Sequence, residues 1–237
     1  MKDILEELNR WIILNNMEII PAILPKNFKE IEDKIELVKG VSDFVQIDIC
    51  DGRFVRSTTW PYWKADENFE KILHEEMGMP AWEDIDYEFD LMIDNPTEDD
   101  TRKWLSAGAA RIVLHLESSK DLYPIISILS GLVEIGIGID LKTNTDEIKK
   151  YEDKIQFVQC MGINKVGFQG QKFDPDTINK VKEVKSKYPN LKVQIDGGVS
   201  LENASLLKDA GADRLVVGSA LFESEDFVHS FEEFKNI

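Results

Sequence analysis

The chain has 237 residues, of which 43% are hydrophobic, and a formal net charge of −17. A chain of this length can bury a sizeable core and suits one barrel or one to two ordinary domains. The acidic balance argues against nucleic acid or an anionic membrane as a partner, because both need a basic surface. No apolar stretch approaches the roughly 18 residues of a membrane span. There is no signal-peptide core, and the two cysteines, Cys50 and Cys160, suit reduced buried thiols, so we expect a cytoplasmic protein.

Apolar residues along the chain alternate between helix-like and strand-like spacing. Residues 3–14 predict an amphipathic helix that could plug the bottom of a barrel. Eight strand patterns follow, at 18–24, 44–49, 87–93, 111–116, 134–139 and 157–161, and from Lys192 and Leu215 onward. Helical patterns come after them, at 28–38, 67–74, 98–107, 122–130, 145–153, 174–188, 200–210 and 224–235. Eight alternating strand–helix units predict a parallel sheet closed into a (β/α)₈ TIM barrel.

An open doubly wound sheet is the alternative architecture. Such a sheet usually has a glycine-rich fingerprint after its first strand, where residues 24–27 of this chain read LPKN. No change in composition marks a linker, so we expect one domain over 1–237, with 1–17 as an added N-terminal helix. The connection at 51–85 is long and rich in aromatic residues. It could serve as a packing surface, a subunit contact in a homo-oligomer, or a lid over a site.

Two strands end in glycine turns that open onto helical patterns. The turns are Gly197–Gly198 in KVQIDGGV and Gly218–Ser219 in LVVGSALF. Backbone N–H groups in such turns are free to bind an anion, and the dipole of a following helix adds positive potential. One turn of this kind is a weak signal, because a tight strand-to-helix turn can itself require glycine. Two of them on neighbouring units predict one phosphate held between them.

On several otherwise apolar strands, polar side chains occupy alternate positions, which share one face and are called here one phase of the strand. Gln46 and Asp48 share this phase on the second strand, and Asp90 and Asp196 lie near the ends of the third and seventh. In a barrel these side chains meet at the C-terminal mouth. We expect no Lys or Arg in their phase, so three unpaired carboxylates would repel one another unless some are protonated or a divalent cation lies among them. Oxygen ligands, including the amide of Gln46, favour Mg²⁺ or Mn²⁺ over Zn²⁺.

Two of these carboxylates also suit acid–base chemistry. A two-base shuttle needs one group to remove a proton α to a carbonyl and another to return a proton on the opposite face. A structural role, with the aspartates bonded to backbone groups, is the alternative. His115 lies on the fourth strand and could either contact the site or satisfy a hydrogen bond in the core.

From about residue 20 to residue 222 the chain resembles the ribulose-phosphate 3-epimerases. The resemblance is carried by PAILPKNF, VQIDICDGRFV, EFDLMIDNP, HLES, GFQGQKF, QIDGGV and VVGSALF. It implies a (β/α)₈ barrel, a pentose-phosphate ketose substrate, and proton transfer at C3 through a 2,3-enediolate held on a divalent metal. Asp48 and Asp196 stand where the family has its acid/base pair, which also binds the metal. The other substrate and phosphate contacts that we expect on this basis are Met92, His115, Gly170, Gly197, Gly198, Gly218 and Ser219.

The chain departs from the family at its metal ligands. Gln46 and Asp90 stand where the family has its two metal-binding histidines, and Ala22 replaces a serine near the substrate. The resulting site is harder and more negative. Binding of Zn²⁺ or Fe²⁺ should weaken, Mg²⁺ or Mn²⁺ could remain, or the metal could be lost.

Three functions are compatible with the sequence. The first is an epimerase that interconverts ribulose 5-phosphate and xylulose 5-phosphate with an altered metal site. The second is another sugar-phosphate isomerase, epimerase or aldolase-like enzyme of the same barrel group. The third is a phosphosugar-binding protein that has lost catalysis. All three have a small sugar phosphate as the ligand.

Overall fold

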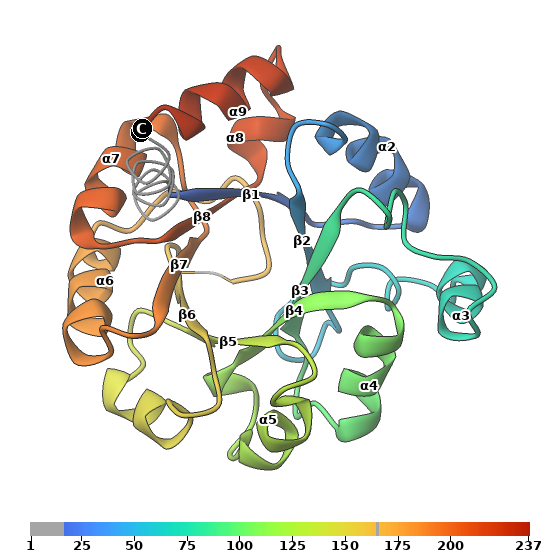
Figure 1. The fold of residues 1–237 in the computed structure, drawn as a ribbon, viewed down its shortest axis with the longest axis horizontal. Coiled ribbons are helices and arrows are strands. Elements are labelled where there is room, and N and C mark those ends of the chain that lie inside the picture. The colour runs from blue at the N-terminus through green and yellow to red at the C-terminus, as the bar shows by residue number, and fades with distance from the viewer. Residues whose placement is uncertain (1–16, 165) are drawn as a thin grey trace, which may run out of the picture.

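The computed structural model describes residues 17–164 and 166–237, so the helix expected at 3–14 lies outside the described residues. Eight parallel strands pair in chain order, and the eighth pairs with the first to close a barrel (Figure 1). The strands are β1 (Glu18–Ile23), β2 (Phe44–Cys50), β3 (Asp86–Met92), β4 (Ala109–His115), β5 (Glu134–Ile139), β6 (Phe157–Met161), β7 (Lys192–Asp196) and β8 (Arg214–Val217). The predicted (β/α)₈ barrel is therefore confirmed.

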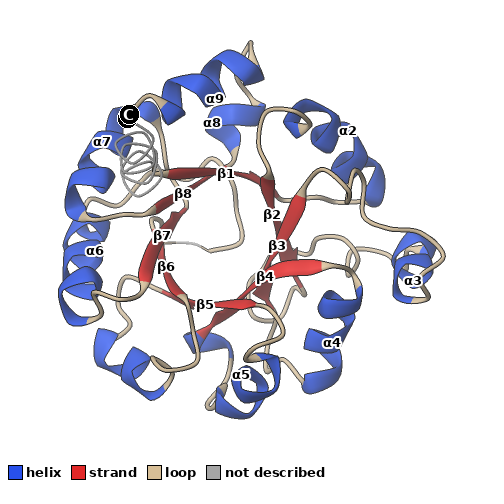
Figure 2. Ribbon diagram, viewed as in Figure 1, coloured by secondary structure: helices blue, strands red, loops and turns tan. Residues whose placement is uncertain are grey.

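Helices form a ring around the barrel (Figure 2). They are α2 (Phe28–Val38), α3 (Glu67–Leu73), α4 (Glu98–Ser106), α5 (Tyr123–Leu129), α6 (Asp176–Lys187), α7 (Leu201–Ala210), α8 (Ser219–Phe222) and α9 (Phe227–Lys235), with the 3₁₀ helices η1 (Leu116–Ser118) and η2 (Thr145–Lys150). Among the described residues, no helix combines the length and apolarity needed to cross a membrane.

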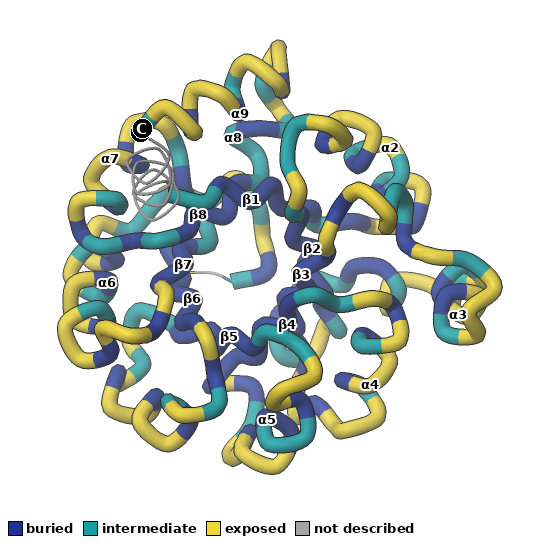
Figure 3. Tube along the Cα trace, in the orientation of Figure 1, coloured by how far each residue is buried: buried dark blue, intermediate teal, exposed yellow. Residues whose placement is uncertain are grey.

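The alternation along each strand sorts side chains into two compartments. Val45, Ile47 and Ile49 of β2 point outward and are fully buried in the core between barrel and helices. Gln46 and Asp48 take the other phase and face the barrel interior. Figure 3 shows the strands as an almost continuously buried ring. Because both faces of the sheet are covered, a polar residue on the inner face needs a partner or a function.

Two connections differ from the expected elements. The segment expected to form an α-helix at 145–153 forms the shorter 3₁₀ helix η2. Its buried residues, Thr145 and Ile148, and the buried Tyr151 that follows it recur every three positions, which matches the three residues per turn of a 3₁₀ helix. After β8, the one-turn helix α8 follows Gly218 directly and precedes α9. The sequence pattern alone did not indicate α8.

The connection between β2 and β3 packs a large aromatic cluster against the outside of the barrel. Trp60 is 1% exposed, and its ring centroid lies 5.5 Å from Phe28, 5.2 Å from Phe69 and 6.1 Å from Trp104. Thr59 ties the segment to the end of β2, because its Oγ1 accepts the Cys50 N–H at 2.7 Å. Packing is thus the role that the structure gives to this part of the connection.

An ion-pair network closes the N-terminal end of the barrel. Arg111 Nη1 lies 2.9 Å from Glu18 Oε1, and Arg111 Nε lies 3.1 Å from Glu134 Oε2. Arg214 Nε lies 2.9 Å from Glu18 Oε2, and its Nη2 lies 2.7 Å from Glu134 Oε1. The expectation of an interior phase without Lys or Arg is therefore wrong at this end, where both arginines are buried inside the barrel.

Glu88 lies between this network and the opposite mouth. It is fully buried, and its Oε2 lies 3.7 Å from Arg111 Nη1. Gln194 Nε2 donates a hydrogen bond to its Oε1. Burial raises the pKa of Glu88 to about 7, although Arg111 and Gln194 oppose the shift. Ionised Glu88 is therefore a destabilising element of the fold.

We expect Glu88→Gln to stabilise the protein at pH 8 and to have little effect at pH 5. Between the ordinary pKa of 4.5 and about 7, the folded state keeps a proton that the unfolded state has released, so stability falls as pH rises through this window. The gain at pH 8 should be on the order of 2 kcal/mol, or a rise in Tm of about 4–8 °C. Thermal melts across pH check this, with exposed Glu147→Gln as the control. A Glu88→Gln protein that melts below wild type at pH 8 contradicts it.

Candidate active site

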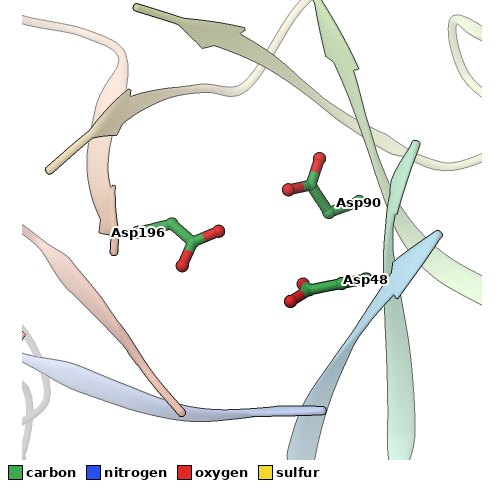
Figure 4. A group of neighbouring side chains, drawn as sticks. All are labelled: Asp48, Asp90 and Asp196. Atoms are coloured by element: carbon green, nitrogen blue, oxygen red, sulfur yellow. The ribbon is translucent and has the colours of Figure 1, made fainter. Parts of the chain in front are cut away.

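Three aspartates from different strands point toward one another at the C-terminal mouth (Figure 4). Asp48 of β2 pairs in register with Asp90 of β3, and Asp196 comes from the end of β7, across β8 and β1. Each offers a carboxylate oxygen, and these oxygens all lie within 4.8 Å of one another. Asp48 and Asp90 are buried, whereas Asp196 is partly exposed toward the cavity. The shared strand phase in the sequence thus corresponds to a real cluster.

Gln46 joins two of the three carboxylates. Its Nε2 donates to Asp48 Oδ1 at 2.8 Å and to Asp196 Oδ2 at 3.1 Å. The sequence suggested Gln46 as an oxygen ligand for a metal, but here its nitrogen faces the carboxylates. One amide group therefore fixes the relative positions of Asp48 and Asp196.

Asp90 has partners of its own. His115 Nε2 lies 2.8 Å from Asp90 Oδ1, and Gln159 Nε2 donates to Asp90 Oδ2 at 3.0 Å. Burial acts to lower the pKa of His115, but the Asp90 carboxylate outweighs it and raises that pKa to about 9. The expectation of three unpaired carboxylates is therefore wrong for Asp90, and of the two roles weighed for His115 the core hydrogen bond is present.

Asp48 and Asp196 hold their protons more tightly than ordinary carboxylic acids. Burial raises the pKa of Asp48, and repulsion from Asp196 and Asp90 adds to the effect. Burial and the charge of Asp90 raise the pKa of Asp196 to about 7, while the Gln46 hydrogen bond opposes the shift. Such a pair can hold one proton between them near neutral pH, which is what acid–base catalysis needs.

Amide side chains form a layer under the aspartates that the sequence analysis did not identify. Gln194 Nε2 donates to Gln159 Oε1 at 2.8 Å, and Gln159 in turn reaches Asp90. Together with Glu88, these residues extend the polar interior from the ion-pair network to the mouth. The strand pattern could have indicated them, because Gln159 and Gln194 lie two residues before Met161 and Asp196 and so face the barrel interior on β6 and β7.

The cavity above the aspartates has the expected phosphate residues on one side. It is small, with a volume of about 40 Å³. Its lining includes Ala22, Asp48, Met92, Gln169, Gly170, Asp196, Gly197, Gly198, Gly218 and Ser219. Gly197 and Gly198 have φ values of 100° and 68°, a conformation that favours glycine. His115, in contrast, is fully buried and does not line this cavity.

Residues 166–173, the covering segment, lie over the barrel mouth above this cavity, and Figure 1 shows them entering the area enclosed by the strands. The approach is close, because a Cβ added at Gly198 would lie 2.7 Å from Phe173 Cα and one at Gly167 would lie 2.7 Å from the Val55 side chain. The cavity thus lies between the ends of the strands and this covering segment.

The donor set at the mouth fits a hard divalent cation. Asp48, Asp90 and Asp196 converge within binding distance of one ion, and all three offer oxygen. Burial and mutual repulsion raise the pKa values of Asp48 and Asp196, and a bound cation would oppose that shift by favouring the ionised carboxylates. The three aspartates are therefore a possible metal site.

Comparison with known proteins identifies relatives over nearly the whole chain. The model of the ribulose-phosphate 3 epimerase family matches residues 18–222. The ribulose-phosphate 3-epimerase of Bacillus subtilis is 29% identical over 226 residues, which cover 92% of this chain and 98% of that protein. The enzyme of the same name from Chlamydia pneumoniae is 31% identical over 198 residues, covering 80% of each chain.

Solved structures share the fold at low sequence identity. A 3-hexulose-6-phosphate synthase from Salmonella typhimurium superposes with a TM-score of 0.67 at 12% identity, over 93% of this chain and 97% of that one. KGPDC from Streptococcus mutans gives a TM-score of 0.66 at 14% identity, over 94% of this chain and 96% of that one. These likenesses show the barrel fold, and the family match is more specific. The chain belongs to the ribulose-phosphate 3 epimerase family, a family of carbohydrate epimerases.

Proposed function

We propose that the protein interconverts D-ribulose 5-phosphate and D-xylulose 5-phosphate, with Asp48 and Asp196 as the two proton-transfer groups. The observation that carries the proposal is their geometry. The two carboxylates come from β2 and β7, face one cavity and share the Gln46 amide. The names of the relatives agree with it, since they are ribulose-phosphate 3-epimerases.

The chemistry requires opposite protonation states in the two aspartates. The ionised one removes the proton from C3, and the electron pair of the broken C–H bond delocalises into the neighbouring carbonyl to give a 2,3-enediolate. The protonated one then donates its proton to the opposite face of C3, which inverts the configuration. The raised pKa values of both groups favour sharing one proton, and Gln46 keeps them in fixed positions.

The substrate phosphate would lie against the glycine turns. Gly197, Gly198 and Gly218 line the cavity beside Asp196, and Ser219 begins α8. Unpaired backbone N–H groups in such turns bind a phosphate dianion without a basic side chain. This end of the substrate would orient C3 toward Asp48 and Asp196.

We further propose that Asp48, Asp90 and Asp196 hold Mg²⁺ or Mn²⁺ in preference to Zn²⁺ or Fe²⁺. Their oxygens fit a hard cation, and neither imidazole nor thiolate contributes to the cluster. When bound, the cation would supply positive charge that stabilises negative charge on the substrate oxygens.

The test is conversion of D-ribulose 5-phosphate to D-xylulose 5-phosphate, followed by NMR with metal-stripped protein and then with each metal added separately. We expect Mn²⁺ or Mg²⁺ to restore at least about tenfold more activity than Zn²⁺. Turnover of a different sugar phosphate alone would select another isomerase or aldolase-like activity. Folded, phosphate-binding protein that is inactive with every metal would identify a binding protein.

A further inference from the structure

A single glutamine amide lies beneath the two amides that donate to the aspartates. Gln194 of β7 is fully buried, and its Nε2 donates to Gln159 Oε1 at 2.8 Å. The same nitrogen lies 3.5 Å from Gln46 Oε1. On their other sides, Gln159 and Gln46 present their nitrogens to one oxygen, Asp196 Oδ2, at 3.4 and 3.1 Å. The Gln194 nitrogen and the Asp196 carboxylate therefore lie at opposite ends of the same pair of amides.

The direction of the Gln159 amide depends on the direction of Gln194. A carboxamide has an oxygen that only accepts and a nitrogen that only donates, and turning it by a half-turn exchanges the two. Because the Gln194 nitrogen lies against the Gln159 oxygen, the Gln159 nitrogen faces the other way, toward Asp90 Oδ2 at 3.0 Å and toward Asp196. A turned Gln159 would place two nitrogens against each other and its oxygen against carboxylates. Donation by Gln194 thus stabilises donation by Gln159.

Glu88 in turn fixes the direction of Gln194. The Gln194 nitrogen carries two hydrogens, and Glu88 Oε1 accepts the one that Gln159 does not. Turning Gln194 would place its oxygen against these two acceptors in the buried interior, where an unpaired polar group is costly. The Gln194 oxygen has no hydrogen-bond partner within residues 17–164 and 166–237. It is therefore the nitrogen of this side chain that holds the network together.

We propose that Gln194 is a positioning residue for proton transfer, because it keeps the Gln159 amide donating to Asp90 and Asp196. The inference rests on the proposed function for its effect on catalysis. Gln194 lies under the amides and outside the cavity lining, so it acts on the substrate through its neighbours rather than by contact. Its loss should therefore affect the chemical step more than substrate binding.

The test compares Gln194→Met with wild type. Methionine has a similar length and volume but cannot donate, so the Gln159 amide becomes free to turn. The kcat for D-ribulose 5-phosphate should fall about 10- to 100-fold, the usual cost of losing a group that orients a catalytic or metal-binding carboxylate. KM should change by less than about threefold, because the residues that line the cavity are unchanged.

Val193→Ala is the matched control for lost stability. Gln194→Met leaves Glu88 Oε1 without its donor and should lower the stability of the fold. Val193 is the neighbouring residue on β7, is equally buried, and packs in the core outside the barrel. Its truncation should lower Tm as well but leave kcat at the wild-type value. A fall in kcat of the same size in Val193→Ala would mean that lost stability alone explains the effect.

A double-mutant cycle shows whether Gln194 acts through Gln159. Gln159→Met removes the amide that Gln194 orients, so its kcat should fall at least as far as that of Gln194→Met. In this background, adding Gln194→Met should lower kcat by less than about threefold more, because there is no Gln159 amide left to turn. Losses that simply multiply contradict the inference. An unchanged kcat in Gln159→Met contradicts it too, whatever the stability of the Gln194 variant.

The side-chain NH₂ signals give a readout that does not depend on activity. Heteronuclear NMR of wild type should show a Gln159 amide hydrogen shifted downfield by its bond to a carboxylate, and the signal is identified by its absence in Gln159→Met. Gln194→Met should lose this shift, whereas Val193→Ala should keep it. An identical Gln159 signal in wild type and Gln194→Met would overturn the inference, because the amide would then keep its direction without Gln194.

Failure of the proposed function leaves a different record. If wild type does not epimerise D-ribulose 5-phosphate but Gln194→Met moves the Gln159 signal, the epimerase proposal fails and the positioning of Gln159 by Gln194 stands. If wild type epimerises the substrate and Gln194→Met has an unchanged kcat, the inference fails and the epimerase proposal stands.

Discussion

Asp48→Asn and Asp196→Asn are each expected to lose roughly 10³-fold in epimerase activity, because each removes one of the two groups that exchange a proton with C3. Asparagine keeps the size of aspartate and can still hydrogen-bond to Gln46, so the fold should survive. The measurement is kcat for D-ribulose 5-phosphate and for D-xylulose 5-phosphate. Asp94→Asn, an exposed aspartate just beyond β3, is the control and should remain near wild type.

Hydrogen exchange in D₂O gives a sharper form of this prediction. Each variant keeps one carboxylate, which can remove the C3 proton only from the epimer whose proton faces it. That carboxylate can return deuterium to the same face, so one epimer should gain deuterium without inverting. The two variants should therefore label opposite epimers. Labelling of the same epimer by both variants, or continued epimerisation by either, contradicts the two-aspartate mechanism.

The alternation of side chains along each strand predicts most of the fold and part of the site. Gln46, Asp48, Asp90 and Asp196 were placed together because side chains two apart on a strand share a face and parallel strands end at one mouth. That reasoning leaves the register between strands open. The structure supplies it, because β2 and β3 pair Asp48 directly with Asp90.

Side-chain partners could not be predicted in the same way. The pairing of His115 with Asp90 depends on which strands are neighbours and on side-chain rotamers, neither of which a strand pattern specifies. The direction of the Gln46 amide depends on the charges around it, since a nitrogen rather than an oxygen is favourable beside two carboxylates. Gln169 lies in a connecting segment whose sequence has no helix or strand periodicity. Its hydrogen bond to Ala22 therefore could not be predicted from the sequence pattern.

The side chain of Gln46 also determines how the site should select metals. An amide nitrogen is not a metal ligand, and in this structure it is already bonded to Asp48 and Asp196. The oxygen cluster of Asp48, Asp90 and Asp196 therefore has no soft or borderline donor. Imidazole suits Zn²⁺ and Fe²⁺, whereas carboxylate oxygen suits Mg²⁺ and Mn²⁺.

Gln46→His is therefore expected to raise the affinity for Zn²⁺ relative to Mn²⁺ by roughly 100-fold, because it adds one neutral nitrogen ligand next to Asp48 and Asp196. The pair of Asp90 and His115 remains intact in this variant. Equilibrium dialysis followed by elemental analysis measures both affinities, and thermal melts with each metal measure the corresponding stabilisation.

Gln46→Met separates the new ligand from the loss of the amide. Methionine has a similar volume but neither the N–H bridge nor an imidazole, so its relative affinity for Zn²⁺ should stay within about tenfold of wild type. A gain in Zn²⁺ binding by both variants would mean that the amide bridge, rather than the missing imidazole, limits the metal. If Gln46→His gains nothing while Asp90→Asn still lowers Mn²⁺ affinity, the cation lies on Asp90 and its neighbours at a distance from position 46. A site at which neither change matters would not use these aspartates for metal at all, and proton transfer would then depend on Asp48 and Asp196 alone.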